Sequence, residues 1–147
     1  MVIFGIIILI CLFVLYVKFC NVLAYIVDPI SIFYILIFSF FSSVIVFGFR
    51  NVFKSFKIGF INFKNSNKEE IITSANIFLT MLIFSLLSGL MFSIIGIISL
   101  FTYYEDMKKA KGFYFSQELL PILYGIVFSI TIYLPIWLRL KNEAKKF

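Results

Sequence analysis

Apolar residues gather along the chain in four long runs, and short polar or charged stretches separate the runs. A helix that crosses the hydrocarbon core of a bilayer needs about 20 mostly apolar residues. The runs therefore predict transmembrane helices over residues 2–22, 30–49, 72–102 and 119–138, of which the third is long enough to project beyond the bilayer. We expect an all-α integral membrane protein with four transmembrane helices in a single domain, residues 1–147.

A signal peptide is the alternative interpretation of the first run. We expect no basic segment ahead of Val2, and no small-x-small cleavage site follows the run. Signal peptides carry both features, so the pattern favours a transmembrane helix.

Composition excludes several classes of protein. Of the 147 residues, 63% are hydrophobic and 14% are charged, whereas a soluble domain is about 45–50% apolar and about 25% charged. This excludes a soluble enzyme, a secreted disulfide scaffold and a nucleic-acid-binding domain. With no His and only Cys11 and Cys20, the chain offers neither a zinc site nor a disulfide framework. We therefore expect no cofactor, no metal and no enzymatic activity.

The basic residues predict the orientation, because cytoplasmic loops of membrane proteins carry an excess of Lys and Arg. Nine of the 13 lie in the connection between spans two and three or in the C-terminal tail: Arg50, Lys54, Lys57, Lys64, Lys68, Arg139, Lys141, Lys145 and Lys146. The other four lie in the remaining connections: Lys18, Lys108, Lys109 and Lys111. Both termini and the short connection between spans two and three should therefore be cytoplasmic.

The segment from Arg50 to Phe63 has two interpretations. It alternates lysines with Phe53, Phe56, Phe60 and Phe63 near helical spacing. This pattern is typical of an amphipathic helix on the inner leaflet, where its basic residues would meet anionic lipids. A cytoplasmic continuation of span two is equally compatible with the pattern.

Two further patterns predict helix starts. Ser66 and Glu69 form an S-x-x-E capping box ahead of span three. Asp28 precedes Pro29, which predicts a turn and the start of span two.

No Asp, Glu, Lys, Arg or His lies within the four predicted spans, apart from Lys18 near the end of the first. Ion and proton paths usually show such a residue, so an acid for proton flow would have to come from a partner. Glu118 stands at the predicted first turn of span four, where the helix dipole favours an anion. A place at an outer pore mouth is the alternative for Glu118.

Small residues recur at packing intervals in the last two spans. They are Ser85, Ser88, Gly89, Ser93, Gly96 and Ser99 in span three and Gly125 and Ser129 in span four. Such rows let helix backbones approach closely in lipid. The stripe could pack within one chain, or span three could face a neighbouring subunit.

Two stretches resemble the MotA/TolQ/ExbB proton-channel family. Spans three and four carry Gly89 and Gly96 seven residues apart, then a loop with Gly112, the pair Tyr124-Gly125 and a proline ten residues later. The family has the same spacings in its last two spans. The sequence Asp28-Pro29-Ile30-Ser31 ahead of a span and a basic segment is similar to the MotA branch.

The resemblance implies a pentameric ring of subunits in the bacterial inner membrane. The ring would surround a single-span partner similar to MotB, TolR or ExbD, whose helix carries the proton-accepting Asp, and would couple ion flow to mechanical work as a stator. The residues implied at the pore or interface are Ser85, Ser88, Gly89, Ser93, Gly96, Ser99, Pro121, Ile122, Tyr124, Gly125 and Ser129.

The chain also departs from the family pattern. Pro121 and Ile122 replace a hydroxyl pair, Leu86 replaces a proline, and the large cytoplasmic domain is absent. These departures support the alternative of a non-conducting membrane scaffold or accessory subunit that keeps the fold without the ion path.

Overall fold

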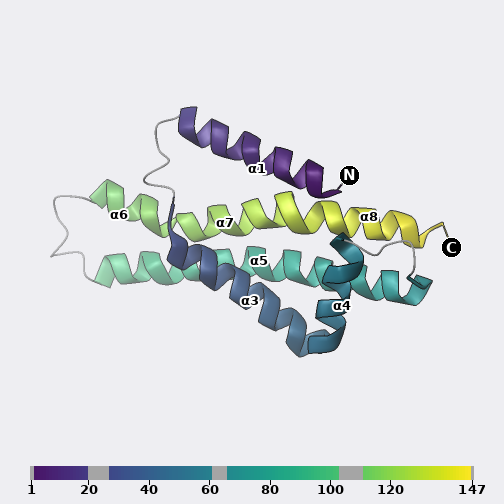
Figure 1. Ribbon diagram of the computed structural model, residues 1–147. Coiled ribbons are helices and arrows are strands. Elements are labelled where there is room, and N and C mark those ends of the chain that lie inside the picture. The colour runs from purple at the N-terminus through teal and green to yellow at the C-terminus, as the bar shows by residue number, and fades with distance from the viewer. Residues whose placement is uncertain (1, 20–26, 61–65, 103–110, 147) are drawn as a thin grey trace.

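The computed structural model describes residues 2–19, 27–60, 66–102 and 111–146. Every regular element in this part of the chain is a helix, so the predicted all-α class is confirmed. In chain order the elements are α1 (Val2–Phe19), α3 (Pro29–Phe47), α4 (Phe49–Phe60), α5 (Lys68–Thr102), α6 (Lys111–Glu118), α7 (Leu120–Phe128), the π-helix η2 (Ser129–Tyr133) and α8 (Leu134–Ala144) (Figure 1).

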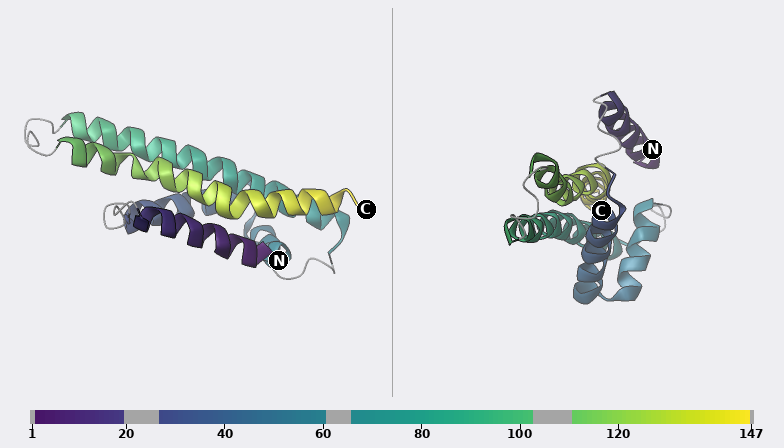
Figure 2. Two further views of the ribbon diagram at one scale, coloured as in Figure 1. Left: turned by 90° about the horizontal axis from the view of Figure 1, so that it is seen from above. Right: turned by 90° about the vertical axis from the view of Figure 1, so that its left-hand side faces the viewer.

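A long antiparallel hairpin forms the centre of the molecule. One arm is α5, and the other is the succession α6, α7, η2 and α8 (Figures 1 and 2). Helix α5 contacts α3, α4, α7 and α8, so the rest of the fold is built around it. Its 35 residues extend over about 52 Å, longer than the ~30 Å hydrocarbon core of a bilayer.

Three helical stretches are long and apolar enough to cross a membrane: Pro29–Phe47, Lys68–Thr102 and Tyr114–Ala144. Large apolar side chains are exposed along them, and on α5 all but Ile72 lie between Ile83 and Phe101. Exposed apolar surface of this extent is typical of contact with lipid rather than with water. These features indicate a membrane protein, and the three stretches match the second, third and fourth predicted spans.

Helix α1 corresponds to the first predicted span and is attached differently. It ends at Phe19, and residues 20–22 of the predicted span lie outside the described residues. It is an apolar helix shorter than the three long stretches. Ile6 is its one buried residue among those whose burial is described, and α1 packs mainly against η2 and α8. Figure 2 shows it standing apart from the other helices.

The predicted start of span two is confirmed at Asp28. Its side chain caps α3 by accepting hydrogen bonds from the Ile30 backbone N–H at 3.1 Å and the Ser31 hydroxyl at 2.5 Å. Pro29 follows in the first turn, where its missing N–H removes no helical hydrogen bond.

Helix α3 ends at Gly48, which has φ +81° and ψ +151°. Only glycine adopts this conformation readily, so the chain turns there and α4 begins at Phe49. Of the two interpretations of this segment, the separate helix is confirmed and the continuation of span two is wrong.

The packed face of α4 differs from the predicted row of phenylalanines. Val52, Ser55, Ile58 and Gly59 are buried, whereas Phe53 is exposed. Gly59 brings α4 close to α5 and α8, because a Cβ there would lie 2.8 Å from a ring carbon of Phe78 and 3.0 Å from Ile136. Phe63 and Lys64 lie outside the described residues.

The predicted capping box at Ser66 and Glu69 is wrong by one residue. Helix α5 begins at Lys68, and its first hydrogen bond runs from the Ile71 N–H to the Asn67 carbonyl at 3.1 Å. Asn67 is therefore the N-cap, and Glu70, three residues later, accepts a hydrogen bond from the Asn67 backbone N–H.

The fourth predicted span begins earlier than expected. Helix α6 already starts at Lys111 and packs against α5, and a single turn at Leu119 joins it to α7. The prediction that Glu118 lies in the first turn of this span is therefore wrong, because packing against α5 extends the helical arm backwards.

A π-helical turn divides the same arm further on. The Leu134 N–H bonds the Ser129 carbonyl five residues back, directly ahead of Pro135. Proline has no N–H and clashes with the preceding helical turn, and a wider turn relieves that clash.

Candidate functional site

The small residues of the hairpin meet each other along one line of contact, which we call the α5–α7 seam. It is formed by Ser85, Gly89 and Ser93 on α5 and by Pro121, Ile122 and Gly125 on α7. A Cβ at Gly125 would lie 2.6 Å from the Ser85 carbonyl oxygen. A Cβ at Gly89 would lie 2.6 Å from the Pro121 carbonyl oxygen. Since both obstacles are backbone atoms, only glycine permits this approach.

Serine hydroxyls join the two arms across and beside the seam. Ser85 donates to the Gly125 carbonyl at 3.2 Å, and Ser129 donates to the Leu82 carbonyl at 3.1 Å. Both serines are buried. These hydroxyls are therefore engaged with backbone carbonyls.

Ser93 provides a hydrogen-bond acceptor for the start of α7. Its hydroxyl accepts a hydrogen bond from the Ile122 backbone N–H at 3.2 Å. This N–H lies in the first turn of α7, where backbone donors have no partner within their own helix. A serine on the neighbouring arm thus completes the start of the helix.

The remaining predicted site residues do not all join the seam. Ser88 is buried and donates to the Ser85 carbonyl, one turn back on its own helix, at 3.1 Å. Ser99 is exposed. The stripe of small residues is thus packed within one chain along part of its length and continues onto the surface.

Glu118 and Gly96 face each other where α6 ends. A Cβ at Gly96 would overlap the Glu118 carboxylate, and the glutamate is half-buried there. The structure therefore places this acid against α5. Its role at a pore mouth stays a prediction.

Two tyrosines attach α3 to the hairpin. The Tyr124 hydroxyl accepts a hydrogen bond from the Asp28 backbone N–H at 2.7 Å. The Tyr133 hydroxyl lies 3.2 Å from that of Ser39. Tyr124 was predicted as a site residue from the Tyr124-Gly125 pair of the family resemblance, whereas Tyr133 belongs to no such motif and was not predicted as a site residue.

The chemistry that the seam supports is limited. Between Glu70 and Thr102, α5 carries no Asp, Glu, Lys, Arg or His, and the other arm carries none between Glu118 and Arg139. No buried side-chain nitrogen or oxygen in the described part of the chain lacks a hydrogen-bond partner. The seam therefore holds the hairpin together and offers no titrating group of its own.

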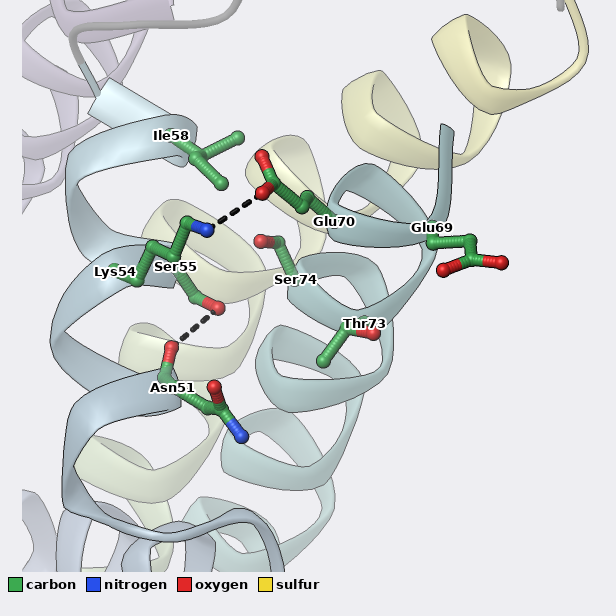
Figure 3. A pocket seen from close by; sticks show the side chains of 8 residues that line it. All are labelled: Asn51, Lys54, Ser55, Ile58, Glu69, Glu70, Thr73 and Ser74. Atoms are coloured by element: carbon green, nitrogen blue, oxygen red, sulfur yellow. Dashed lines mark hydrogen bonds and ion pairs between the residues drawn. The ribbon is translucent and has the colours of Figure 1, made fainter. Parts of the chain in front are cut away.

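A polar cleft lies elsewhere, between α4 and the first turns of α5. Its volume is about 210 Å³, and its lining residues are Asn51, Lys54, Ser55, Ile58, Glu69, Glu70, Thr73 and Ser74 (Figure 3). The Lys54 ammonium pairs with Glu70 Oε1 at 2.6 Å. This cleft was not predicted, because its charged pair joins residues from two helices whose packing depends on the turn at Gly48.

No protein-family model, curated protein or solved structure matches the chain. The resemblance to the MotA/TolQ/ExbB proton-channel family therefore stays a prediction from short motifs.

Proposed function

We propose that this protein is a membrane-embedded scaffold or accessory subunit that does not conduct ions by itself. The observation that carries the proposal is the chemistry of the α5–α7 seam. The seam hydroxyls of Ser85 and Ser93 bond backbone groups, and neither arm carries a charged residue within the seam, from Ser85 to Ser93 or from Pro121 to Gly125. A proton path needs groups that titrate or water that they order.

Reconstitution into proteoliposomes tests this proposal. With a potassium gradient and valinomycin, vesicles that contain the purified protein should take up protons no faster than empty vesicles. Proton uptake that rises with the amount of protein would refute the proposal. Removal of the seam hydroxyls in Ser85→Ala and Ser93→Ala would then show whether the path follows the seam.

The topology that we propose has four transmembrane helices, with α1 as the first and with both termini in the cytoplasm. The excess of Lys and Arg in the connection after α3 and in the C-terminal tail supports it. The start of α1, helix α4 and the end of α8 also lie toward the same end of the hairpin (Figure 1). Reporter fusions at each terminus and after Thr102 should give cytoplasmic, cytoplasmic and external readings.

Helix α4 is the proposed contact with anionic lipid on the cytoplasmic side. Phe49 and Phe53 are exposed on it, and Arg50, Lys54 and Lys57 lie beside them. An exposed aromatic face with basic neighbours suits a helix at the headgroup level.

A ring subunit of the MotA/TolQ/ExbB type is the second candidate. The exposed apolar face of α5, from Ile83 to Phe101, favours it, because that face lies outside the seam and is open to a neighbouring copy or a partner helix. In this proposal a homo-oligomer, pentameric by the resemblance, surrounds a single-span partner with an intramembrane Asp in the bacterial inner membrane. Purification in mild detergent should then recover a ring with that partner. A monodisperse monomer without a partner would contradict it.

A further inference from the structure

The cleft between α4 and α5 combines opposite charges with uncharged polar groups. Lys54 and Glu70 form their ion pair at its wall, with side chains 52% and 33% exposed. Glu69 also contributes to the lining, but its carboxylate points away from Lys54 and Glu70 (Figure 3). Exposed ion pairs contribute little to stability, so exchanging this pair for contacts with a ligand costs little.

Ser74 is the second observation, independent of the charges. It is 1% exposed and lines the cleft, yet its hydroxyl makes no hydrogen bond within the described residues. Its neighbour Ser55 is also buried but donates to the Asn51 carbonyl at 2.8 Å. No fully enclosed side-chain oxygen of the described residues lacks a partner, so the Ser74 hydroxyl keeps access to the cleft, where it can hydrogen-bond a ligand.

We propose that this cleft binds a primary ammonium joined to a phosphate, the phosphoethanolamine headgroup of a membrane lipid. The ammonium would pair with Glu70 and hydrogen-bond Ser74, and the phosphate would pair with Lys54. Each charge of the zwitterion thus meets its opposite, and the number of ion pairs does not fall when Lys54 leaves Glu70.

The lining groups discriminate between headgroups. A purely anionic ligand that paired with Lys54 would leave the Glu70 carboxylate unpaired beside it, so such a ligand is disfavoured. A trimethylammonium group carries no N–H, so it cannot satisfy the hydroxyl and carboxylate acceptors that a primary ammonium satisfies with three donors. The cavity of about 210 Å³ is small, so it takes a headgroup and leaves the acyl chains outside.

The position of the cleft fits a lipid source and rests on the proposed membrane location. Helix α4 follows the apolar α3 directly after Gly48, and its exposed Phe49 and Phe53 suit the boundary between headgroups and acyl chains. The cleft between α4 and α5 would then open at headgroup depth.

Lipid retention tests the proposal. The full chain is placed in nanodiscs of phosphatidylglycerol with equal amounts of phosphatidylethanolamine and phosphatidylcholine, and lipids that stay bound are counted by native mass spectrometry. We expect about tenfold more phosphatidylethanolamine than phosphatidylcholine, as loss of charged hydrogen bonds predicts. Glu70→Gln should abolish this preference and Ser74→Ala should reduce it severalfold.

Glu143→Gln is the matched control, because Glu143 pairs with Lys146 at 2.8 Å on α8 and does not line the cleft. It should leave the preference unchanged. Circular dichroism checks that each variant folds, and Ser74→Ala keeps the test decisive if Glu70→Gln does not fold. Equal retention of the two lipids by the wild type, or equal losses in Glu143→Gln and Ser74→Ala, would overturn the proposal.

A second arm separates a lipid source from a soluble one. Soluble phosphoethanolamine and phosphocholine are titrated into the protein in detergent, and its melting temperature is followed. A preference for phosphoethanolamine in either arm supports the cleft, and a preference in nanodiscs alone indicates the lipid. No preference in both arms refutes the site. Proton uptake by the proteoliposomes would refute only the proposed scaffold function. It says nothing about the ratio of phosphatidylethanolamine to phosphatidylcholine, so the two proposals can fail separately.

Discussion

Helix α1 and the α5–α7 seam are both strongly apolar, yet they are attached to the molecule in opposite ways. A Cβ added at Gly5 on α1 would meet nothing within 4 Å, whereas one at Gly89 or Gly125 would meet backbone at 2.6 Å. Ile6 is the one residue of α1 buried among those whose burial is described, and no side-chain hydrogen bond ties the described part of α1 to another helix.

The difference shows what makes helices adhere in lipid. Lipid tails are as apolar as leucine, so covering an apolar helix gains little. Close backbone approach at glycine and hydrogen bonds between helices provide the attraction. The seam has both, and α1 has neither, which explains why α1 packs so little against the rest.

The largest test of this contrast is Gly125→Leu. The new side chain would collide with the Ser85 carbonyl, so the arms must separate. We expect a loss of about 3 kcal/mol, at the upper end for overpacking, and a fall in melting temperature in detergent.

Gly5→Leu is the matched control, because the same residue enters an open site on α1. Its melting temperature should equal that of the wild type. A similar loss in both variants would show that α1 is held as tightly as the seam. If Gly125→Leu changes the oligomer size and leaves the protomer stable, Gly125 belongs to an interface between subunits.

Gly48→Ala should have the next largest effect. No atom within 4 Å obstructs a Cβ at this position, so only the backbone conformation opposes the substitution. We expect a cost of about 2 kcal/mol, measured by thermal unfolding, because φ is +81°. An unchanged stability would mean that α3 can continue into α4 and that the turn is not needed.

Loss of the seam hydroxyls should have a smaller effect. Ser85→Ala and Ser129→Ala each remove one hydrogen bond between the arms, worth about 0.6 kcal/mol in a membrane. The double variant should lose about 1 kcal/mol, since the two bonds lie at different levels. Ser99→Ala, at an exposed site, should change nothing. An equal loss of stability in Ser99→Ala would show that the effect does not come from the seam hydrogen bonds.

The smallest effect is expected on α1. Leu12 is 58% exposed, so Leu12→Ala removes a side chain that touches little of the protein. Stability should stay within about 0.5 kcal/mol of the wild type. A loss of the size seen for core leucines would show that another helix covers α1 in the membrane.

The apolar runs predicted the long helices well, because a run of this length has few other solutions in a membrane protein. Asp28 followed by Pro29 predicted the start of α3 for a local reason, since the cap involves only Ile30 and Ser31. A local pattern was less informative where two patterns of the same kind overlap. The sequence predicted the N-cap at Ser66 instead of Asn67, because each of these two residues has a glutamate three positions later.

The parts that could not be predicted depend on which elements meet. The stripe of small residues indicates close packing but not its partner, so packing within the chain and packing between subunits stayed open until Gly89 was placed against Pro121. The sequence left open whether the chain turns after span two, because glycine is also common inside transmembrane helices and Gly48 does not by itself mark a turn. The polar cleft followed from that turn, since Lys54 reaches Glu70 only after α4 folds back onto α5.

The π-helical turn at Ser129–Tyr133 sets how the last arm is used. It inserts one extra residue, so every side chain after it is rotated by roughly 100° relative to an uninterrupted α-helix. Tyr124 faces α3 before the turn, and Ile136 meets α4 after it. Deleting a single residue there would restore a regular α-helix of nearly the same composition. Its C-terminal half would then turn a different face toward α4 and α5.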